Sequence, residues 1–314
     1  GLYWVDILNN SAYKISNEGT LELSRVKGIK SYFESRLENK QFASTYYNSY
    51  TGQGTNLGDN AFLYHGITTG YDASNNEVLF SFLERKFFED RGKGWWEIFR
   101  TETLVYSETT GSFTSKYSFA TPMFINTQDK LLSVRPLNHE YDEEIEEVFR
   151  IHDNEIWIHN EIESLTAPRA SWYGDVYDSS ITFLVNKGPS QTKVFDNIEM
   201  YTKLTNVLGQ SGDINGTWNK LLCTNSYQLV ATDLYGPLQL PDITVDEVED
   251  PEEVTQNIKR RERTWKAALP RVVKGGTPVR LRDKYLKINL RYDNKAGGKL
   301  QTYYVKTKFR VSKR

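Results

Sequence analysis

Short alternating runs of residues, separated by turn-forming residues, limit the possible folds of this chain more than any other feature. Strands are expected at residues 2–8, 12–15 and 20–23, with Asn, Ser and Gly between them. Asn and Gly tolerate the backbone of tight turns, and a period of two is the period of a β-strand. Short strands with such turns are typical of sandwiches, barrels and propeller blades.

The same arrangement returns along the first half of the chain. Three further strand–turn–strand units are expected, at residues 67–71 with 77–83, 101–107 with 113–119, and 147–151 with 155–159. Their spacing, roughly 40–50 residues, is that of β-propeller blades. The 20 Tyr, 15 Phe and 7 Trp also suit a pleated sheet surface. We therefore predict an all-β fold of propeller-like antiparallel blades, followed by further antiparallel β-structure, with little helix.

The second half contains longer strands. Residues 180–186 form a nearly continuous apolar run, and we expect a strand that is buried on both faces. Residues 284–291 and 300–311 alternate between apolar and polar, and residues 293–298 are expected to join them as a hairpin. Residues 257–265 fit either a short helix or an extended arm.

Three regions follow from these patterns. Residues 1–170 are the propeller-like region, residues 171–256 a β-rich region with an acidic, proline-containing loop, and residues 257–314 a basic arm with its hairpin. The first residues already have the pattern of the inside of a strand, where a natural N-terminus rarely lies. We therefore expect a piece of a larger protein, produced by cleavage or truncation.

Opposite charges gather in different parts of the chain, although its net charge is only −2. Residues 257–314 hold 19 Lys and Arg against 3 Asp and Glu, whereas residues 1–256 hold 20 against 38. Acidic residues are dense at 139–163 and 241–253. This division predicts either surfaces that meet on neighbouring copies of the chain or solvated faces that never meet.

The basic segment at residues 257–265 contains four cations and a tryptophan. Three interpretations remain open: it contacts an acidic surface of a neighbouring copy, it contacts nucleic-acid phosphates, or it has no specific partner. The acidic residues at 142–147 offer a complementary surface for the first interpretation. The candidate subunit-interface residues are Lys259, Arg260, Arg261, Arg263, Trp265, Asp142, Glu143, Glu144, Glu146 and Glu147.

Nothing in the sequence predicts catalysis. The single cysteine, Cys223, lies in an apolar run and is expected to be buried, so it predicts neither a nucleophile nor a disulfide. His152 and His159 flank a predicted turn, but zinc-ligand spacing is absent. The carboxylates at 142–147 fit a hydrated surface better than a glycosidase pair. We therefore expect no catalytic residue, no cofactor and no metal, and we find no run of the roughly 18 apolar residues that span a membrane.

Several segments resemble the muzzle or nozzle proteins of crAss-like bacteriophages, also described as virion stabilisation proteins. Their order matches the C-terminal portion of such a protein. The segments are residues 70–72, 77–80, 103–108, 111–119, 192–199, 257–265, 282–287 and 309–314.

The resemblance implies a structural virion protein at the distal end of a short phage tail. It implies a ring of copies, six-fold in tails of this type, that helps gate the channel through which DNA leaves. Expected partners are copies of the chain, the rest of its precursor, other tail proteins and DNA in passage. Two alternatives stay open: a receptor- or glycan-binding tail-tip protein, with Tyr46, Tyr47, Trp95 and Trp96 exposed, and a polysaccharide depolymerase.

Overall fold

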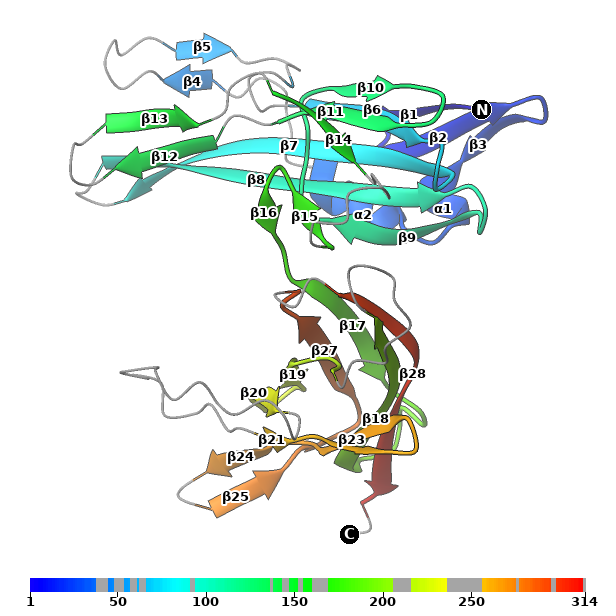
Figure 1. Cartoon of the computed structure of the whole chain (residues 1–314), viewed down its shortest axis with the longest axis vertical. Coiled ribbons are helices and arrows are strands. Elements are labelled where there is room, and N and C mark those ends of the chain that lie inside the picture. The colour runs from blue at the N-terminus through cyan, green and yellow to red at the C-terminus, as the bar shows by residue number, and fades with distance from the viewer. Residues whose placement is uncertain are drawn as a thin grey trace. The chain divides into compact units, whose positions relative to one another are not determined.

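Strands dominate the structure, a computed structural model that describes most of the chain. The described residues are 1–37, 45–47, 54–56, 61, 66–90, 94–135, 138–142, 147–151, 155–159, 169–205, 216–235, 256–274, 277–294 and 298–312. Only two short helices occur among them, so the expected all-β fold is confirmed. The chain divides into two compact units, Gly1–Glu163 and Ser164–Arg314 (Figure 1). The three regions expected from the sequence stay a prediction.

The first unit opens with a three-stranded antiparallel sheet, which confirms the first strands predicted. Its strands are β1 (Leu2–Asp6), β2 (Ser11–Ser16) and β3 (Gly19–Glu22). Two helices follow, α1 (Leu23–Val26) and α2 (Lys30–Leu37). A small separate pair is formed by β4 (Thr45–Tyr47) and β5 (Gly54–Asn56).

A four-stranded antiparallel meander follows, in the order β6-β7-β8-β9. Its strands are β6 (Gly66–Asp72), β7 (Glu77–Asp90), β8 (Gly94–Ser107) and β9 (Ser112–Tyr117). The units predicted at residues 67–83 and 101–119 are therefore confirmed as hairpins. β7 and β8 are longer than predicted and pair from Glu77–Ser107 to Asp90–Gly94.

The last sheet of this unit has the order β10-β11-β14, and a separate hairpin interrupts it in the sequence. The strands are β10 (Phe124–Asn126), β11 (Leu131–Val134) and β14 (Ile156–His159), with the hairpin β12 (Asn138–Asp142) and β13 (Glu147–Ile151). β13 pairs with β12 and β14 pairs with β11, so the hairpin expected at residues 147–159 is wrong. Alternation identified both strands, but it does not specify the partner of either.

The meander is covered on both faces by other parts of the first unit. Phe80 and Phe82 pack with Phe33 of α2 on one face, and Leu79 packs with Leu131 of β11 on the other. Side chains of successive strand residues point to opposite faces, so β7 contributes to both layers. Within the described residues the sheets stack as layers and form no closed propeller, so the propeller stays a prediction.

The second unit is built on two sheets. A two-stranded hairpin of β15 (Ser171–Trp172) and β16 (Asp175–Val176) precedes them. The first sheet has the order β17-β27-β19-β20-β21 and is antiparallel except for the parallel pair β20–β21. Its strands are β17 (Ser179–Val185), β27 (Leu286–Tyr292), β19 (Lys220–Thr224), β20 (Leu229–Tyr235) and β21 (Gln256–Asn257).

The second sheet is centred on β18, which pairs with β23 on one side and with β28 on the other. Its strands are β18 (Lys193–Thr205), β22 (Lys259–Arg261), β23 (Thr264–Ala268), β26 (Arg282–Asp283) and β28 (Lys299–Val311). A hairpin of β24 (Arg271–Lys274) and β25 (Thr277–Arg280) connects β23 to β26. The inner faces of the two sheets share one apolar core that includes Phe195, Met200, Trp265 and Ile288.

Two expectations for this unit are wrong. β17 lies at the edge of its sheet, and its residues Ile181 and Leu184 are 41% and 58% exposed, so the strand is not buried on both faces. β27 pairs with β17 and β19, whereas β28 pairs with β18, so in the described pairs these two strands do not form the expected hairpin. An apolar or alternating run identifies a strand, but its partners decide whether it is central or at an edge.

Candidate subunit-interface surface

The basic segment proposed as an interface folds as the hairpin β22–β23, with Glu262 and Arg263 at its turn. Both turn residues have positive φ, of 48° and 68°. Asn and Gly usually occupy such a two-residue turn because a β-carbon disfavours this backbone conformation. The missing Asn-Gly signal explains why a helix or an arm was expected here.

Successive side chains of the hairpin point to opposite faces of the sheet, so some predicted interface residues are exposed and others point to the core. Lys259 and Arg261 are exposed on the outward face of the sheet, and Arg263 is exposed at the turn. Trp265 is only 1% exposed and belongs to the core. The guanidinium of Arg260 lies 5.4 Å from the centre of the Trp265 ring. Trp265 therefore packs within its own chain and offers no exposed contact.

Further cations continue this outward face across four strands. The strand register aligns Lys259 with Lys266, Lys266 with Glu199, and Glu199 with Lys306. Along β28, alternate residues from Lys306 to Arg310 point outward, because Val305 and Phe309 pack on the core. We call this surface the cationic face, and its exposed residues are Lys259, Arg261, Lys266, Arg280, Arg282, Lys306, Lys308 and Arg310. Sequence reasoning missed the last six, although the period of two at residues 306–310 is a signal for three of them.

Glu199 lies at the centre of the cationic face and is only 7% exposed. Its Oε1 lies 2.6 Å from Nζ of Lys308 and 3.3 Å from Nζ of Lys266. The hydrogen bond from Lys308, supported by Lys266, holds the pKa of the Glu199 carboxyl below its usual range. Glu199 is therefore ionised at neutral pH and orders two of the cations around it.

Asp196 organises the cations at one end of the cationic face. It lies in a β-bulge of β18, between Phe195 and Asn197, where the register with β28 shifts. Arg310 binds its carboxylate with two hydrogen bonds, from Nε at 2.8 Å and from Nη2 at 3.1 Å. Nη1 of Arg280 donates a third at 2.7 Å. The bulge thus turns one carboxylate toward two guanidinium groups.

Tyrosines occupy the other end of the outward face. A second register shift next to Tyr201 places Tyr303 and Tyr304 against it, with ring centres 4.7 Å and 5.9 Å away. The hydroxyl of Tyr304 lies 3.3 Å from that of Thr264 on β23. Tyr303 and Tyr304 remain 57% and 46% exposed, so this end is accessible and aromatic.

The acidic half of the predicted interface is described only in part. Asp142 ends β12 and Glu147 begins β13, directly opposite each other in the register. Glu143, Glu144 and Glu146 lie outside the described residues. The cationic and acidic candidates therefore belong to different units of the chain, and their pairing stays a prediction.

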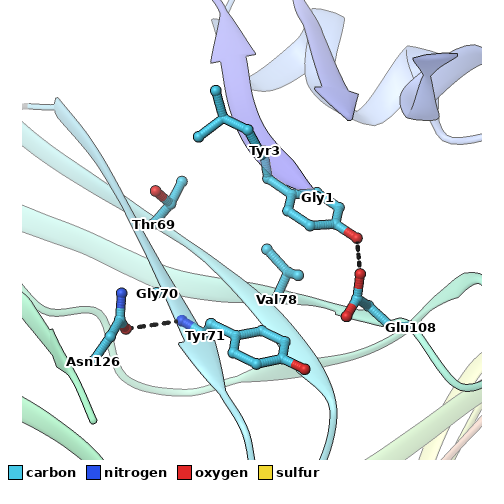
Figure 2. A pocket seen from close by; sticks show the side chains of 9 residues that line it. Gly1, Tyr3, Thr69, Gly70, Tyr71, Val78, Glu108 and Asn126 are labelled. Atoms are coloured by element: carbon cyan, nitrogen blue, oxygen red, sulfur yellow. Dashed lines mark hydrogen bonds between the residues drawn. The ribbon is translucent and has the colours of Figure 1, made fainter. Parts of the chain in front are cut away.

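A pocket of about 330 Å³ lies in the first unit, between β1 and the meander (Figure 2). The hydroxyl of Tyr3 donates to Glu108, and Nζ of Lys14 lies 3.2 Å from the same carboxylate. Burial and the Glu108 contact raise the pKa of Tyr3 to about 12, and the hydrogen bond from Tyr3 lowers the pKa of Glu108. Near neutral pH Tyr3 therefore stays protonated and Glu108 stays ionised, so the two do not exchange a proton as an acid–base pair. Their contact links β1 to the meander.

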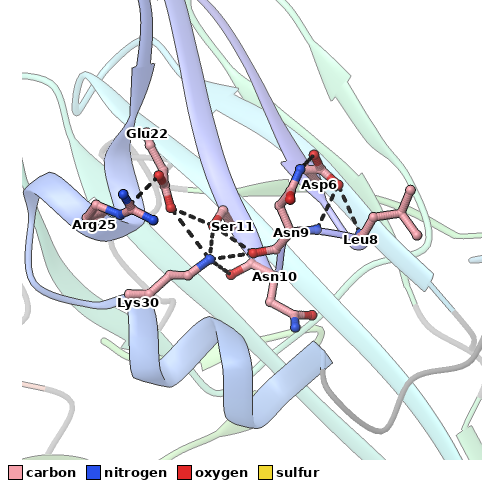
Figure 3. Close-up of polar contacts among 8 residues, drawn as sticks. All are labelled: Asp6, Leu8, Asn9, Asn10, Ser11, Glu22, Arg25 and Lys30. Atoms are coloured by element: carbon pink, nitrogen blue, oxygen red, sulfur yellow. Dashed lines mark hydrogen bonds and ion pairs between the residues drawn. The ribbon is translucent and has the colours of Figure 1, made fainter.

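A second polar cluster fixes the helices to the first sheet (Figure 3). Nζ of Lys30 donates to the backbone carbonyls of Asn9 and Asn10 and to the hydroxyl of Ser11, and lies 3.5 Å from Glu22. Four oxygens thus surround one ammonium group. This arrangement satisfies a lysine that starts α2 and serves the fold.

Other side chains that could act as nucleophiles or bases are buried. Oγ of Ser133 lies 2.5 Å from Nε2 of His159, but Ser133 is completely buried and no substrate can reach it. Cys223 is also completely buried, as expected. Among the described residues no cluster of His, Cys, Asp and Glu could hold a metal, and no helix is long and apolar enough to span a membrane. His152 lies outside the described part of the chain.

Comparison with protein families gives two matches. Residues 1–137 match the model described as Crassvirus muzzle protein, and residues 167–272 match the model described as Crassvirus muzzle protein C-terminal domain. The chain belongs to the crassvirus muzzle protein family. The resemblance found from the sequence is therefore confirmed. Comparison with curated proteins gives no match.

Membership of the muzzle family makes the chain a structural virion protein and a component of the phage tail. The muzzle C-terminal domain match includes β18, β22 and β23, which carry the centre and one side of the cationic face. β28 lies beyond residue 272 and completes the face on the other side.

Proposed function

We propose that this chain is a ring-forming subunit of the distal tail, and that charged surfaces join neighbouring copies. The observation that carries the proposal is the cationic face, which gathers eight exposed cations, seven on the sheet of β18 and the eighth, Arg280, at the end of β25. Most of the acidic residues lie before residue 257 in the same chain. Surfaces of opposite charge on one chain favour head-to-tail contacts, which close into a ring when the rotation between copies allows it.

The acidic surplus of residues 1–256 supports a role in the passage of DNA. A wall of negative charge repels phosphates and keeps DNA from adhering to it. In this proposal the muzzle ring narrows or closes the channel, and its charge lets DNA pass once it opens. The chain supports assembly and passage and catalyses no reaction. A six-fold ring, the other tail proteins and the rest of a precursor as partners belong to the same proposal.

Assembly of the purified chain tests this proposal. Mass photometry at low and at high salt should show one closed oligomer that dissociates as salt screens the charged contacts. Phage carrying a charge reversal in the acidic run at 142–147 should assemble fewer complete tails or eject DNA more slowly. Two results together would contradict the proposal. The purified chain would stay monomeric at all salt concentrations, and the charge reversal would leave tail assembly and DNA ejection unaffected.

A further inference from the structure

We infer that the cationic face binds the acidic segment at residues 241–253 of a second copy of this chain. This inference rests on the proposed ring and names one pair of surfaces that meet in it, in addition to the acidic run at 142–147. The cationic face lies on the outward side of the sheet formed by β22, β23, β18, β26 and β28, opposite the side that packs on the core, and Arg280 of β25 joins it through Asp196. The acidic segment lies in the connection between β20 and β21 of the other sheet.

The charges of the two surfaces are complementary. Eight cations and the two carboxylates of Asp196 and Glu199 leave the cationic face with six surplus positive charges. Residues 241–253 contain seven acidic residues and no basic one. Cations spaced two residues apart along a strand lie about 7 Å from one another. An extended acidic peptide that lies across these strands can therefore meet several of them at once.

The connection between β20 and β21 is long enough to reach another molecule. Leu234 pairs with Gln256, so the twenty residues between Tyr235 and Gln256 leave and return at neighbouring positions. Half of that length, fully extended, reaches about 33 Å. The distance from β22 to β28, three strand spacings, is about 14 Å. A segment from a second copy can thus cross all four strands of the cationic face.

An acidic segment fits this face better than a nucleic acid. The net charge of the whole chain is −2, so its basic surplus is already balanced by acids that it carries itself. A contact between copies pairs the cations of the cationic face with the acids of residues 241–253. A nucleic-acid contact would leave the acidic segment without a partner.

The first experiment measures the docking alone. A fluorescent peptide of residues 241–253 is titrated into a segment variant, D242N/D246N/E247Q/E249Q/D250N/E252Q/E253Q, in which all seven acidic residues of the segment are neutralised. The peptide should bind at physiological salt, and adding the face change K259E/R261E/K306E should weaken its affinity at least tenfold. The matched control K220E/K287E/R291E makes the same charge change on exposed cations of the other sheet and should alter the affinity less than twofold. Equal weakening by both changes, or tighter binding of an oligonucleotide of equal charge, would overturn the inference.

The second experiment asks whether the segment docks on its own copy or on another. The face variant and the segment variant should each stay monomeric. Their mixture should form a heterodimer and stop there, because only one intact segment and one intact face can meet. A mixture that stays monomeric while the peptide binds would place the segment on its own copy and contradict the inference. If the peptide binds and the heterodimer forms but the unaltered chain makes no ring, the proposed ring fails and the docking stands.

Discussion

The ammonium group of Lys308 lies 2.6 Å from the Glu199 carboxylate, across the strand pair β18–β28. The two residues are more than a hundred positions apart in the chain. Glu199 also pairs with Lys266 of β23, so one carboxylate connects three strands. Both lysine side chains are about half exposed, at 48%. Solvent therefore screens the attraction, and the pairs order the face more than they stabilise it.

Glu199→Gln should lower the free energy of unfolding of the second unit by about 1 kcal/mol at pH 7. The pKa of Glu199 is lowered in the folded chain, so its contribution is present above the ordinary glutamate pKa and is lost as the pH falls. The difference between the two proteins should shrink in acid. Urea unfolding at pH 7 and at pH 4 measures it, and a difference that grows toward pH 4 would contradict this assignment.

Cys223 should not react with a thiol reagent in the folded chain. Its side chain is completely buried, and burial raises the pKa of the thiol to about 12. The reactive thiolate is therefore scarce and inaccessible near pH 8. Labelling should be slow in buffer and rapid in urea, where one thiol per chain reacts. Rapid labelling of the native protein would show that the core of the second unit opens more readily than its packing implies.

Lys193→Met should destabilise the second unit by about 2–3 kcal/mol. Lys193 is completely buried, and its ammonium group donates to the carbonyls of Gly188, Gln191 and Lys284. Methionine fills similar space but leaves three carbonyls without this donor. The rate of Cys223 labelling in dilute urea reports the effect. The matched control Lys187→Met changes an exposed lysine and should stay within about 0.5 kcal/mol of the unaltered chain.

Two apolar runs show how far the sequence predicts this fold. Residues 78–83 and 181–185 are both rich in apolar residues, and both form strands. β7 lies inside the meander with layers on both faces, whereas β17 lies at a sheet edge. Period and composition identify strands. The neighbours of a strand depend on contacts between residues far apart in the sequence, which one sequence does not reveal.

The cationic face could be predicted only in part for the same reason. Lys259 and Arg261 belong to a dense basic run that is visible in the sequence. Lys306 and Lys308 join them only because β28 pairs with β18 in a register that aligns Lys306 with Glu199. Trp265 is adjacent to the basic run, but its position in β23 turns it into the core. The density of basic residues in the sequence indicates the region of the cationic face, but the strand pairing decides which residues lie on it.

Replacing Glu262 and Arg263 with Asn and Gly should stabilise the second unit by about 1 kcal/mol. Both residues have positive φ, which Asn and Gly adopt at lower cost. The control variant, with Ala at both positions, removes the same charges but keeps a β-carbon at each and should bring no gain. Thermal unfolding compares the two variants. Equal stability of both would show that the turn stores no strain.

His159 should make the first unit less stable in mild acid. It is 7% exposed, its ring stacks on Phe119 with centres 5.2 Å apart, and burial lowers its pKa from 6.5 to about 4. Between these pH values the unfolded chain takes up a proton that the folded chain does not. Stability therefore falls as the pH drops from about 6.5 to 4, by roughly 2–3 kcal/mol in total.

The variant His159→Gln isolates this effect, because glutamine has no proton to take up in this range. Hydrogen exchange of β11 and β14 measures local stability at pH 7 and pH 5 in both proteins. The unaltered chain should lose protection at pH 5 beyond the loss seen in the variant. The comparison cancels contributions from the carboxylates, which are common to both proteins. An identical pH dependence of the two would mean that the pKa of His159 is the same in the folded and the unfolded chain, and that burial does not keep its imidazole neutral.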